Sequence, residues 1–209
     1  MIRKSIFRAA VAALLAFPAL ADVVTGEYVF EGLPIKDSSG SGHEPMNQPR
    51  LAALVKEGDI SGIRMANGDG LRIPFSAFPG NPGRLDCEVK IDKISEPRHL
   101  FIVYGKGDVM VFLARYGCLE MRYLHRGGSG KWVTSKRTPL PLDKLAKVSI
   151  QWTLPGKITL SVDGEQKLEM EVPTSGGFDR GSAIFIGSNQ RSELVFPGII
   201  RSVKLSYQD

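Results

Sequence analysis

The chain has 209 residues, of which 43% are hydrophobic and 23% are charged, and its formal net charge is +5 at neutral pH. This composition fits one globular domain with a substantial core. The sequence contains no block of basic residues and no alternation of basic with aromatic residues. That absence excludes the usual nucleic-acid-binding patterns, and no internal repeat or low-complexity tract is present either.

The first 21 residues have the three parts of a signal peptide. Three basic residues come before an apolar run at 9–17, and Ala19-Leu20-Ala21 supplies small residues for cleavage. The apolar run is shorter than the ~20 residues that span a bilayer. We therefore expect cleavage after Ala21, a periplasmic or secreted protein, and a mature chain without a transmembrane segment. Removing this leader leaves 24 basic against 22 acidic residues, a net charge of about +2.

The first third of the mature chain is expected to hold few regular elements. Apolar residues indicate a first strand at 22–30. Residues 32–62 are rich in Gly, Pro, Ser and Asn, and they form the longest irregular region, with one helical turn expected at 51–55. Apolar positions on both sides of Asn67-Gly68-Asp69-Gly70 predict a hairpin over 63–73.

The central third alternates apolar with polar residues, the pattern of half-buried strands. Between residues 85 and 91 the alternation is regular and points Cys87 inward. Two further apolar runs, at 100–104 and 109–116, flank a Gly-rich turn and predict a hairpin. A strand at 119–125 follows, and after a second Gly-rich turn the chain enters a strand at 132–134.

The C-terminal third contains the strongest hairpin signal. Strands at 148–154 and 158–162 flank Pro155-Gly156, a pair that favours a turn. Three more strands are expected near 168–172, 182–187 and 199–207. About twelve strands and no long helix are therefore predicted. Because strands of this kind bury one face each, the fold class is all-β, an antiparallel two-sheet β-sandwich of jelly-roll type.

The order and spacing of these pieces resemble a known domain family. The segments 158–164, 184–187 and 196–205 look like the second half of a laminin G-like or concanavalin A-like domain, and 37–42 and 63–74 resemble parts of its first half. The resemblance covers nearly all of residues 22–209 and implies a single jelly-roll domain whose first strand pairs near its last. One departure is Ala146-Lys147, where the family often has Trp-His.

Catalytic patterns are weak in this sequence. Retaining glycosidases on such sandwiches carry two carboxylates in a Glu-x-Asp-x-x-Glu spacing, which is absent here. The run Arg191-Ser192-Glu193-Leu194 resembles a short motif of alginate lyases, but its companion motifs are missing. The three histidines have no zinc-ligand spacing, and no serine lies in a nucleophile elbow. These observations favour a non-catalytic protein and leave a carbohydrate-active enzyme as the alternative.

Calcium is the one cofactor that the sequence suggests. Asp37, Asp69 and Asp179 lie in loops, similar domains often bind calcium, and the ion needs only a few loop oxygens. We expect the site, if present, at Asp37 and Asp69. Aspartates in Gly-rich turns also hydrogen-bond their own backbone, and that alternative stays open.

The two cysteines raise the question of a disulfide. Export permits one, and Cys87 and Cys118 are the only cysteines. Cys87 points inward by its position in the alternation, whereas Cys118 lies at a strand junction. Both states, paired and free, are compatible with the sequence.

The best candidate for ligand binding surrounds Trp132, because Trp152 alternates in phase with core residues. Trp132 follows a Gly-rich turn and is close in sequence to Arg122, Tyr123 and His125. If Leu119 and Met121 lie in the core, Tyr123 points inward and the outward set is Arg115, Arg122, His125 and Trp132. An aromatic ring among cations suits an acidic glycan better than a neutral one.

The sequence therefore predicts an exported, non-catalytic binding module, with carbohydrate as the first choice of ligand and acidic glycans preferred. A protein-protein interaction domain is the alternative from another class, since this sandwich hosts both.

Overall fold

The computed structural model describes residues 22–93, 95–105, 107–125, 130–173, 175, 177–178 and 181–208. The expected signal peptide, residues 1–21, lies outside the described residues. Within them, fourteen strands form two sheets, and the helical content is a single 3-10 turn, η1 (Phe75–Ala77). None of these residues belongs to a helix that could cross a membrane.

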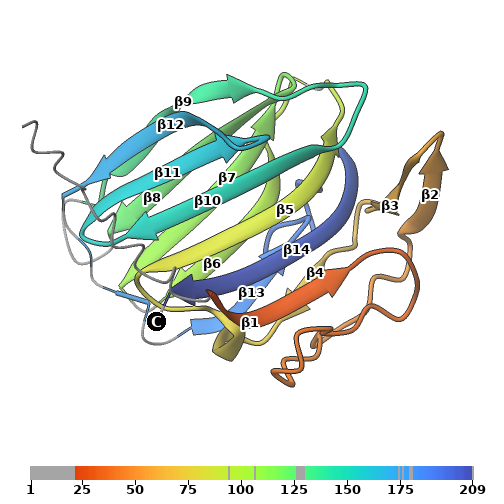
Figure 1. The fold of residues 1–209 in the computed structure, drawn as a ribbon, viewed down its shortest axis with the longest axis horizontal. Coiled ribbons are helices and arrows are strands. Elements are labelled where there is room, and N and C mark those ends of the chain that lie inside the picture. Colours follow the sequence, from red (N-terminus) through yellow and green to blue (C-terminus); the bar gives the residue numbers. More distant parts are fainter. Residues whose placement is uncertain are drawn as a thin grey trace, which may run out of the picture.

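The two antiparallel sheets pack face to face as the two layers of a sandwich (Figure 1). The eight-stranded sheet has the order β12 (Glu165–Val172), β11 (Gly156–Val162), β10 (Ala146–Thr153), β5 (Gly83–Ile91), β14 (Gly198–Gln208), β3 (Ile60–Arg64) and β2 (Ala53–Glu57), with β1 (Asp22–Val29) also paired to β14. The six-stranded sheet has the order β4 (Leu71–Ile73), β13 (Gly181–Ile186), β6 (Arg98–Gly105), β7 (Asp108–Arg115), β8 (Cys118–His125) and β9 (Trp132–Pro139). The predicted all-β antiparallel sandwich is confirmed.

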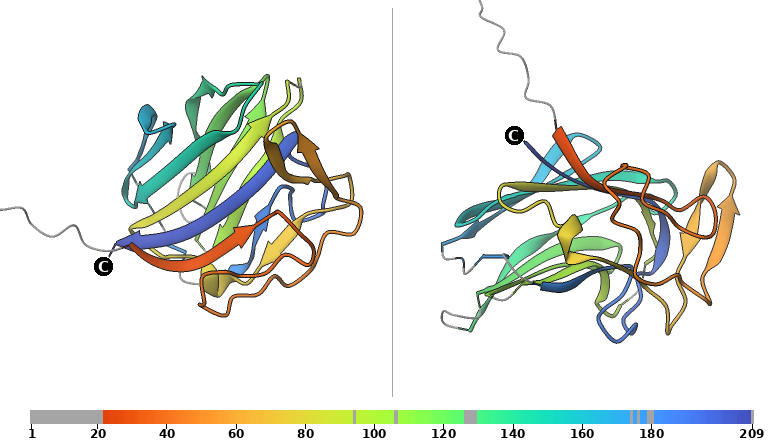
Figure 2. Two further views of the ribbon diagram at one scale, coloured as in Figure 1. Left: turned by 45° about the vertical axis from the view of Figure 1, so that its right-hand side comes forward. Right: turned by 90° about the horizontal axis from the view of Figure 1, so that it is seen from below.

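Several predicted pairings are also confirmed. The strands β10 and β11 form the C-terminal hairpin, with Trp152 opposite Ile158. The strands β6 and β7 form the central hairpin. The first strand pairs with the last, which brings the start of β1 beside the end of β14 (Figure 2).

The core lies between the sheets and is built by the alternating side chains of both layers. Trp152 is 1% exposed, and its indole N–H donates to the carbonyl of Gly80 at 2.8 Å. Its ring lies against Gly83, where a Cβ would come within 2.4 Å of the indole. A glycine is therefore required at this position of β5, and the prediction that Trp152 is a core residue is confirmed.

Two predictions in the first third were wrong. The expected helical turn at 51–55 is replaced by β2, which pairs with β3 as a hairpin. The expected hairpin over 63–73 does not form, because β3 pairs with β14 in one sheet and β4 pairs with β13 in the other. The Gly-rich turn at 67–70 carries the chain from one layer to the other. Turn residues indicate that the chain reverses, but they do not specify which sheet receives it.

The two cysteines are free thiols, which is one of the two states that the sequence left open. Cys87 lies in β5 with its side chain in the core, whereas Cys118 begins β8 in the opposite sheet. They therefore lie in different sheets, in neither the same strand nor adjacent strands.

Candidate ligand-binding face of the six-stranded sheet

The outer face of the six-stranded sheet carries an apolar cluster of its own. In β7, Met110 and Phe112 face the core between the sheets, so Val111 faces the opposite side. The buried members of this outer cluster are Ile102, Val109, Val111, Leu113, Ala183 and Phe185. Tyr104 and Leu124 pack against it, and the Arg72 guanidinium lies over the Phe185 ring at 5.6 Å. We call this group the outer apolar floor.

Strand register places arginines on both sides of the floor. One row crosses all six strands through directly paired residues: Arg72, Phe185, Ile102, Val111, Arg122 and Thr134. The centre of the row is apolar, and a guanidinium lies toward each end. Phe185, Ile102 and Val111 are at most 5% exposed, so a ligand crossing the sheet along this row would contact the two arginines and the side chains that cover the floor.

A second row joins Leu113, Glu120 and Arg137. The Glu120 carboxylate, with a side chain 6% exposed, accepts hydrogen bonds from Arg122 at 2.6 Å and from Arg137 at 3.0 Å. Burial alone would raise the pKa of this carboxyl, but the bonds from Arg137 and Arg122 outweigh burial and lower the pKa. Two arginines share one carboxylate, so the cluster of Arg122, Arg137 and Glu120 has a net positive charge. The shared carboxylate holds both guanidinium groups in place.

Trp132 lies at the edge of the same face. It begins β9 and pairs with Leu124. This pair is two residues along the strands from the pair formed by Arg122 and Thr134, so both pairs lie on the same face. Trp132 is 47% exposed, whereas Trp152 is buried in the core. Diagonal neighbours on one sheet face are about 7–8 Å apart, which is within reach of an aromatic ring and a long arginine side chain. The structure therefore brings together Trp132 and Arg122, as the sequence predicted.

Arg115 is on the same face but is engaged locally. Its position in β7 follows Leu113 by two residues, so it shares the outward direction. Its Nε–H donates to the carbonyl of Ser95 at 2.9 Å, and its guanidinium lies over the Tyr116 ring at 4.9 Å. Arg115 is therefore a fixed cation at the far end of β7, away from Trp132.

Two of the predicted ligand-binding residues do not belong to this face. Tyr123 is 1% exposed and packs edge-on against Phe178. His125 shares the inward direction of Tyr123, because the two residues are two apart in β8. Its Nδ1 lies 2.9 Å from Oδ1 of Asp108. The prediction that His125 points outward was wrong, and the alternation of β8 already contained the signal.

The residues that hold His125 and Tyr123 form a polar network at the end of the sandwich interior. Asp108 is 0% exposed, and its Oδ2 accepts bonds from the Tyr123 hydroxyl, from Ser175 Oγ at 2.6 Å and from the Gly177 N–H at 2.9 Å. Burial, followed by the bond to Asp108, raises the pKa of Tyr123. This network ties Ser175, Gly177 and Phe178 to β7 and β8, so we assign it a structural role.

The proposed calcium ligands are each engaged by the backbone. Asp37 accepts bonds from the N–H groups of Glu27, Ser39 and His43 at 2.9–3.0 Å. Asp69 accepts bonds from Arg50 at 2.9 Å and Leu51 at 2.6 Å. Among the described residues no group of three His, Cys, Asp or Glu is arranged to hold a metal, and Asp179 is outside them. The bond from Ser39 to Asp37 matches the alternative role considered for loop aspartates, whereas Asp69 binds the backbone of a distant segment. Calcium binding stays a prediction that melting temperatures in chelator and in calcium would test.

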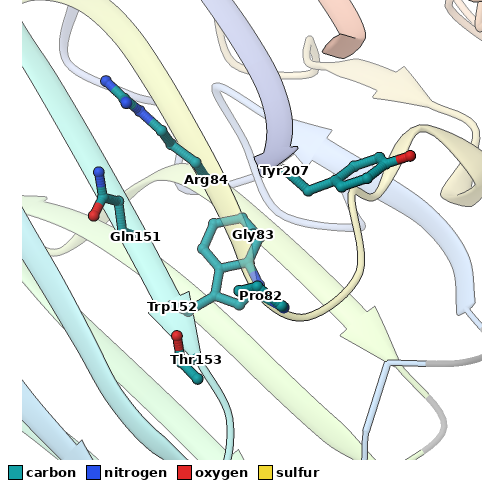
Figure 3. Close-up of a pocket in the computed structure, with 7 residues that line it drawn as sticks. All are labelled: Pro82, Gly83, Arg84, Gln151, Trp152, Thr153 and Tyr207. Atoms are coloured by element: carbon teal, nitrogen blue, oxygen red, sulfur yellow. The ribbon is translucent and has the colours of Figure 1, made fainter. Parts of the chain in front are cut away.

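Two depressions lie on or near the other sheet. One, of about 420 Å³, is on the outer face of the eight-stranded sheet and is lined by charged residues of both signs together with Ser149 and Ser202. The other, of about 120 Å³, lies over Gly83 and Trp152 beside Arg84, Gln151 and Tyr207 (Figure 3). In the second, Trp152 is covered by Gly83 and offers little ring surface to a ligand. Neither depression combines an exposed aromatic ring with unshared cations.

Comparisons with known proteins bear on the fold. No protein-family model matches the chain, and no curated protein is similar to it in sequence. Domain 4 of AbnA, an extracellular GH43 arabinanase of Geobacillus stearothermophilus solved with arabinotriose, is similar in structure, with a TM-score of 0.67, 15% identity, and coverage of 90% of this chain and 93% of that one. The botulinum neurotoxin serotype D ligand binding domain, solved with N-acetylneuraminic acid, has a TM-score of 0.68 and 13% identity over 90% of this chain.

A third similar structure is the binding domain of Paraclostridial Mosquitocidal Protein 1, with a TM-score of 0.64 and 15% identity over 88% of this chain. This chain covers 48% of that domain and 48% of the neurotoxin domain, so it matches about half of each. At these identities the similarity shows the fold alone: the chain is a jelly-roll-like β-sandwich of the kind found in carbohydrate-binding and receptor-binding domains.

Proposed function

We propose that this chain is an exported, non-catalytic binding module of laminin G-like type, and that it binds acidic glycans on the outer face of the six-stranded sheet. The observation that carries the proposal is the placement of exposed Trp132 beside Arg122, at the edge of the outer apolar floor. A tryptophan ring stacks on the apolar face of a sugar, while a guanidinium binds carboxylate or sulfate through two parallel hydrogen bonds.

The charge of this face favours an anion over a neutral sugar. Arg122 and Arg137 share Glu120, and Arg72 lies at the other end of the central row. An anionic group would therefore be attracted without breaking the Glu120 pairs. The arabinotriose and N-acetylneuraminic acid bound by the two similar structures support a glycan ligand in general, and the second is an acidic sugar.

The test is a binding panel that separates charge from sugar identity. The purified protein, from residue 22 onward, is titrated by calorimetry with polygalacturonate, hyaluronan and heparin, and with arabinan as a neutral comparison. Trp132→Ala and Arg122→Ala should each weaken binding to the preferred acidic glycan by about 1–3 kcal/mol, the size expected for anchoring residues.

The matched control is Arg84→Ala, which removes an arginine from the outer face of the eight-stranded sheet. It should bind like the wild type. Melting temperatures of all variants show whether each is folded. Wild-type affinity in the Trp132→Ala, Arg122→Ala double variant would place the site elsewhere, and binding to none of the glycans would favour the alternative, a protein-protein interaction domain.

A further inference from the structure

A depression of about 420 Å³ lies where β6 begins, at the end of the sandwich beside the crossing between the two sheets. Its walls come from Arg98 at the start of β6, from Asn67 in the crossing between the sheets, and from the loop residues Arg191, Ser192 and Glu193. A backbone bridge between His99 and Val195 attaches this loop to β6. The depression is therefore built by three segments that are distant in sequence.

The loop of this depression has a strained and firmly held backbone. Ser192 and Leu194 have φ values of 57° and 52°, in the left-handed region that residues other than glycine seldom adopt. Such a conformation is unfavourable in itself and persists only where the surrounding structure holds it. The Gly68 N–H donates to the Ser192 carbonyl at 2.9 Å, and the His99 N–H donates to the Leu194 carbonyl at 2.8 Å. Strain that is maintained by its neighbours in this way is typical of binding sites.

The depression has cations available for a ligand. Arg191 is exposed, and within the described part of the chain it forms no ion pair. Arg98 pairs with Glu96 at 2.6 Å, but the Glu96 side chain is 67% exposed, so the pair contributes little and is readily replaced. Glu193 is the one carboxylate among the lining residues, and it is exposed to solvent. Two guanidiniums against one solvated carboxylate give a site that favours an anion.

His99 connects this depression to the face described above. It pairs with Leu113, which pairs with Glu120, so His99 lies on the row of Glu120 and Arg137. Burial lowers the pKa of His99 to about 4, against a hydrogen bond to the Leu194 backbone that raises it, and the charges of Arg122 and Arg98 act in the same direction as burial. Its Nδ1 is buried and has no hydrogen-bond partner among the described residues. The imidazole is therefore neutral at physiological pH.

The separation between the two cationic groups follows from sheet geometry. Arg98 pairs with Ala114, which pairs with Leu119, so the backbone positions of Arg98 and Arg122 are two strands and three residues apart, about 10 Å across the strands and about 10 Å along them. The two positions are thus about 14 Å apart, farther than a single sugar ring reaches. One ligand must contain several rings to contact both.

We infer that the depression formed by Arg98, Arg191 and Ser192 is a second acidic subsite, which binds the carboxylate of a uronate-containing chain whose other units lie on Arg122 and Trp132. This inference rests on the proposed function and specifies it further, because it makes the ligand a polymer with regularly spaced acid groups. The guanidinium geometry suits planar carboxylates in particular.

The experiment compares a short and a long probe on the same protein. Calorimetric titration with digalacturonate and octagalacturonate gives the ratio of the two affinities. The Arg98→Gln, Arg191→Gln double variant should lower this ratio about tenfold, because only the octamer spans both subsites. Arg191→Gln alone, which removes no hydrogen bond of the fold among the described residues, should lower the ratio about threefold and guards against misfolding of the double variant.

The control is the Arg84→Gln, Arg201→Gln variant, which removes the same charge from the eight-stranded sheet and should leave the ratio unchanged. An unchanged ratio in Arg98→Gln, Arg191→Gln, with octamer binding intact, would overturn the subsite while leaving the proposed function in place. If the wild type binds neither probe nor any other acidic glycan, both the subsite and the proposed function fail.

Discussion

The outer faces of the two sheets obey the same alternation but present opposite chemistry. On the eight-stranded sheet, one row of paired residues reads Glu27, Lys204, Asp86, Ser149 and Ser161, in which charges alternate in sign and hydroxyls follow. On the six-stranded sheet, the central row has two arginines separated by Phe185, Ile102 and Val111. The first face mixes charges of both signs. The second has an apolar centre and cations that are not fully matched.

This difference indicates which outer face is the better candidate for a binding surface. An antiparallel sheet ordinarily keeps one face apolar for the core and one polar for solvent, and the eight-stranded sheet does so. The six-stranded sheet is apolar on both faces, and on its outer side Tyr104, Leu124 and Arg72 shield the floor. A depression of about 420 Å³ on the eight-stranded sheet provides space, but its mixed charges give no preference for an anion.

The contrast in burial predicts the largest effect on stability. Ile102 is 1% exposed between Phe185 and Val111, so Ile102→Ala should lower the free energy of unfolding by about 2–4 kcal/mol. The matched substitution on the other outer face, Thr159→Ala, should cost less than about 1 kcal/mol. Urea denaturation of both variants measures the difference. An equal loss of unfolding free energy in the two variants would mean that the two outer faces are equally solvated, which would contradict the proposed difference in burial.

The contrast in charge predicts a smaller, pH-dependent effect. Glu120 has a lowered pKa in the folded protein, so its contribution to stability is present above its unfolded pKa of about 4.3 and is lost as the pH falls through the folded value. Glu120→Gln should therefore cost about 1–2 kcal/mol at pH 7 and progressively less in acid. Urea unfolding at a series of pH values down to pH 3 measures this. A loss of stability that is the same at all pH values would show that the ionised form of Glu120 is not the source of its stabilising effect.

The two thiols should differ in reactivity, because one is buried in the core and the other is partly exposed. Burial raises the pKa of Cys87 in the core, whereas Cys118 is partly exposed at the start of β8. In native protein a thiol reagent should modify one cysteine, which Cys118→Ser abolishes, and the second should react only after unfolding. Finding no thiol in denatured, unreduced protein would show that the two cysteines form a disulfide.

Much of the fold followed from local pattern. The alternation in β5, β10 and β11 identified the strands, and Pro155-Gly156 located the hairpin turn. The region 51–73 was mispredicted because its glycines specify turns but not partners. Gly62 illustrates this, since a Cβ there would meet the Ile200 carbonyl at 2.5 Å, a contact with a strand more than a hundred residues away. Such a long-range contact leaves no local signal.

The candidate face was only half predictable. Arg122 and Trp132 were found because they are near each other in sequence and alternate outward. Arg72 and Phe185 come from β4 and β13, and only the strand order places them in one row with Arg122. His125 was misplaced although the alternation of β8 already assigned it the inward direction of Tyr123, whereas its partner Asp108 comes from another strand and could not be read from the pattern.

The most direct test of the central claim is to observe which face a ligand contacts. The Nε–H groups of arginines give separate NMR signals, and both sheets have them: Arg72, Arg122 and Arg137 on the proposed face, and Arg84 and Arg201 on the other. On titration with octagalacturonate, the signals of the first set should shift and saturate together, while those of the second set stay in place. Shifts confined to Arg84 and Arg201 would contradict the account and place the ligand on the eight-stranded sheet.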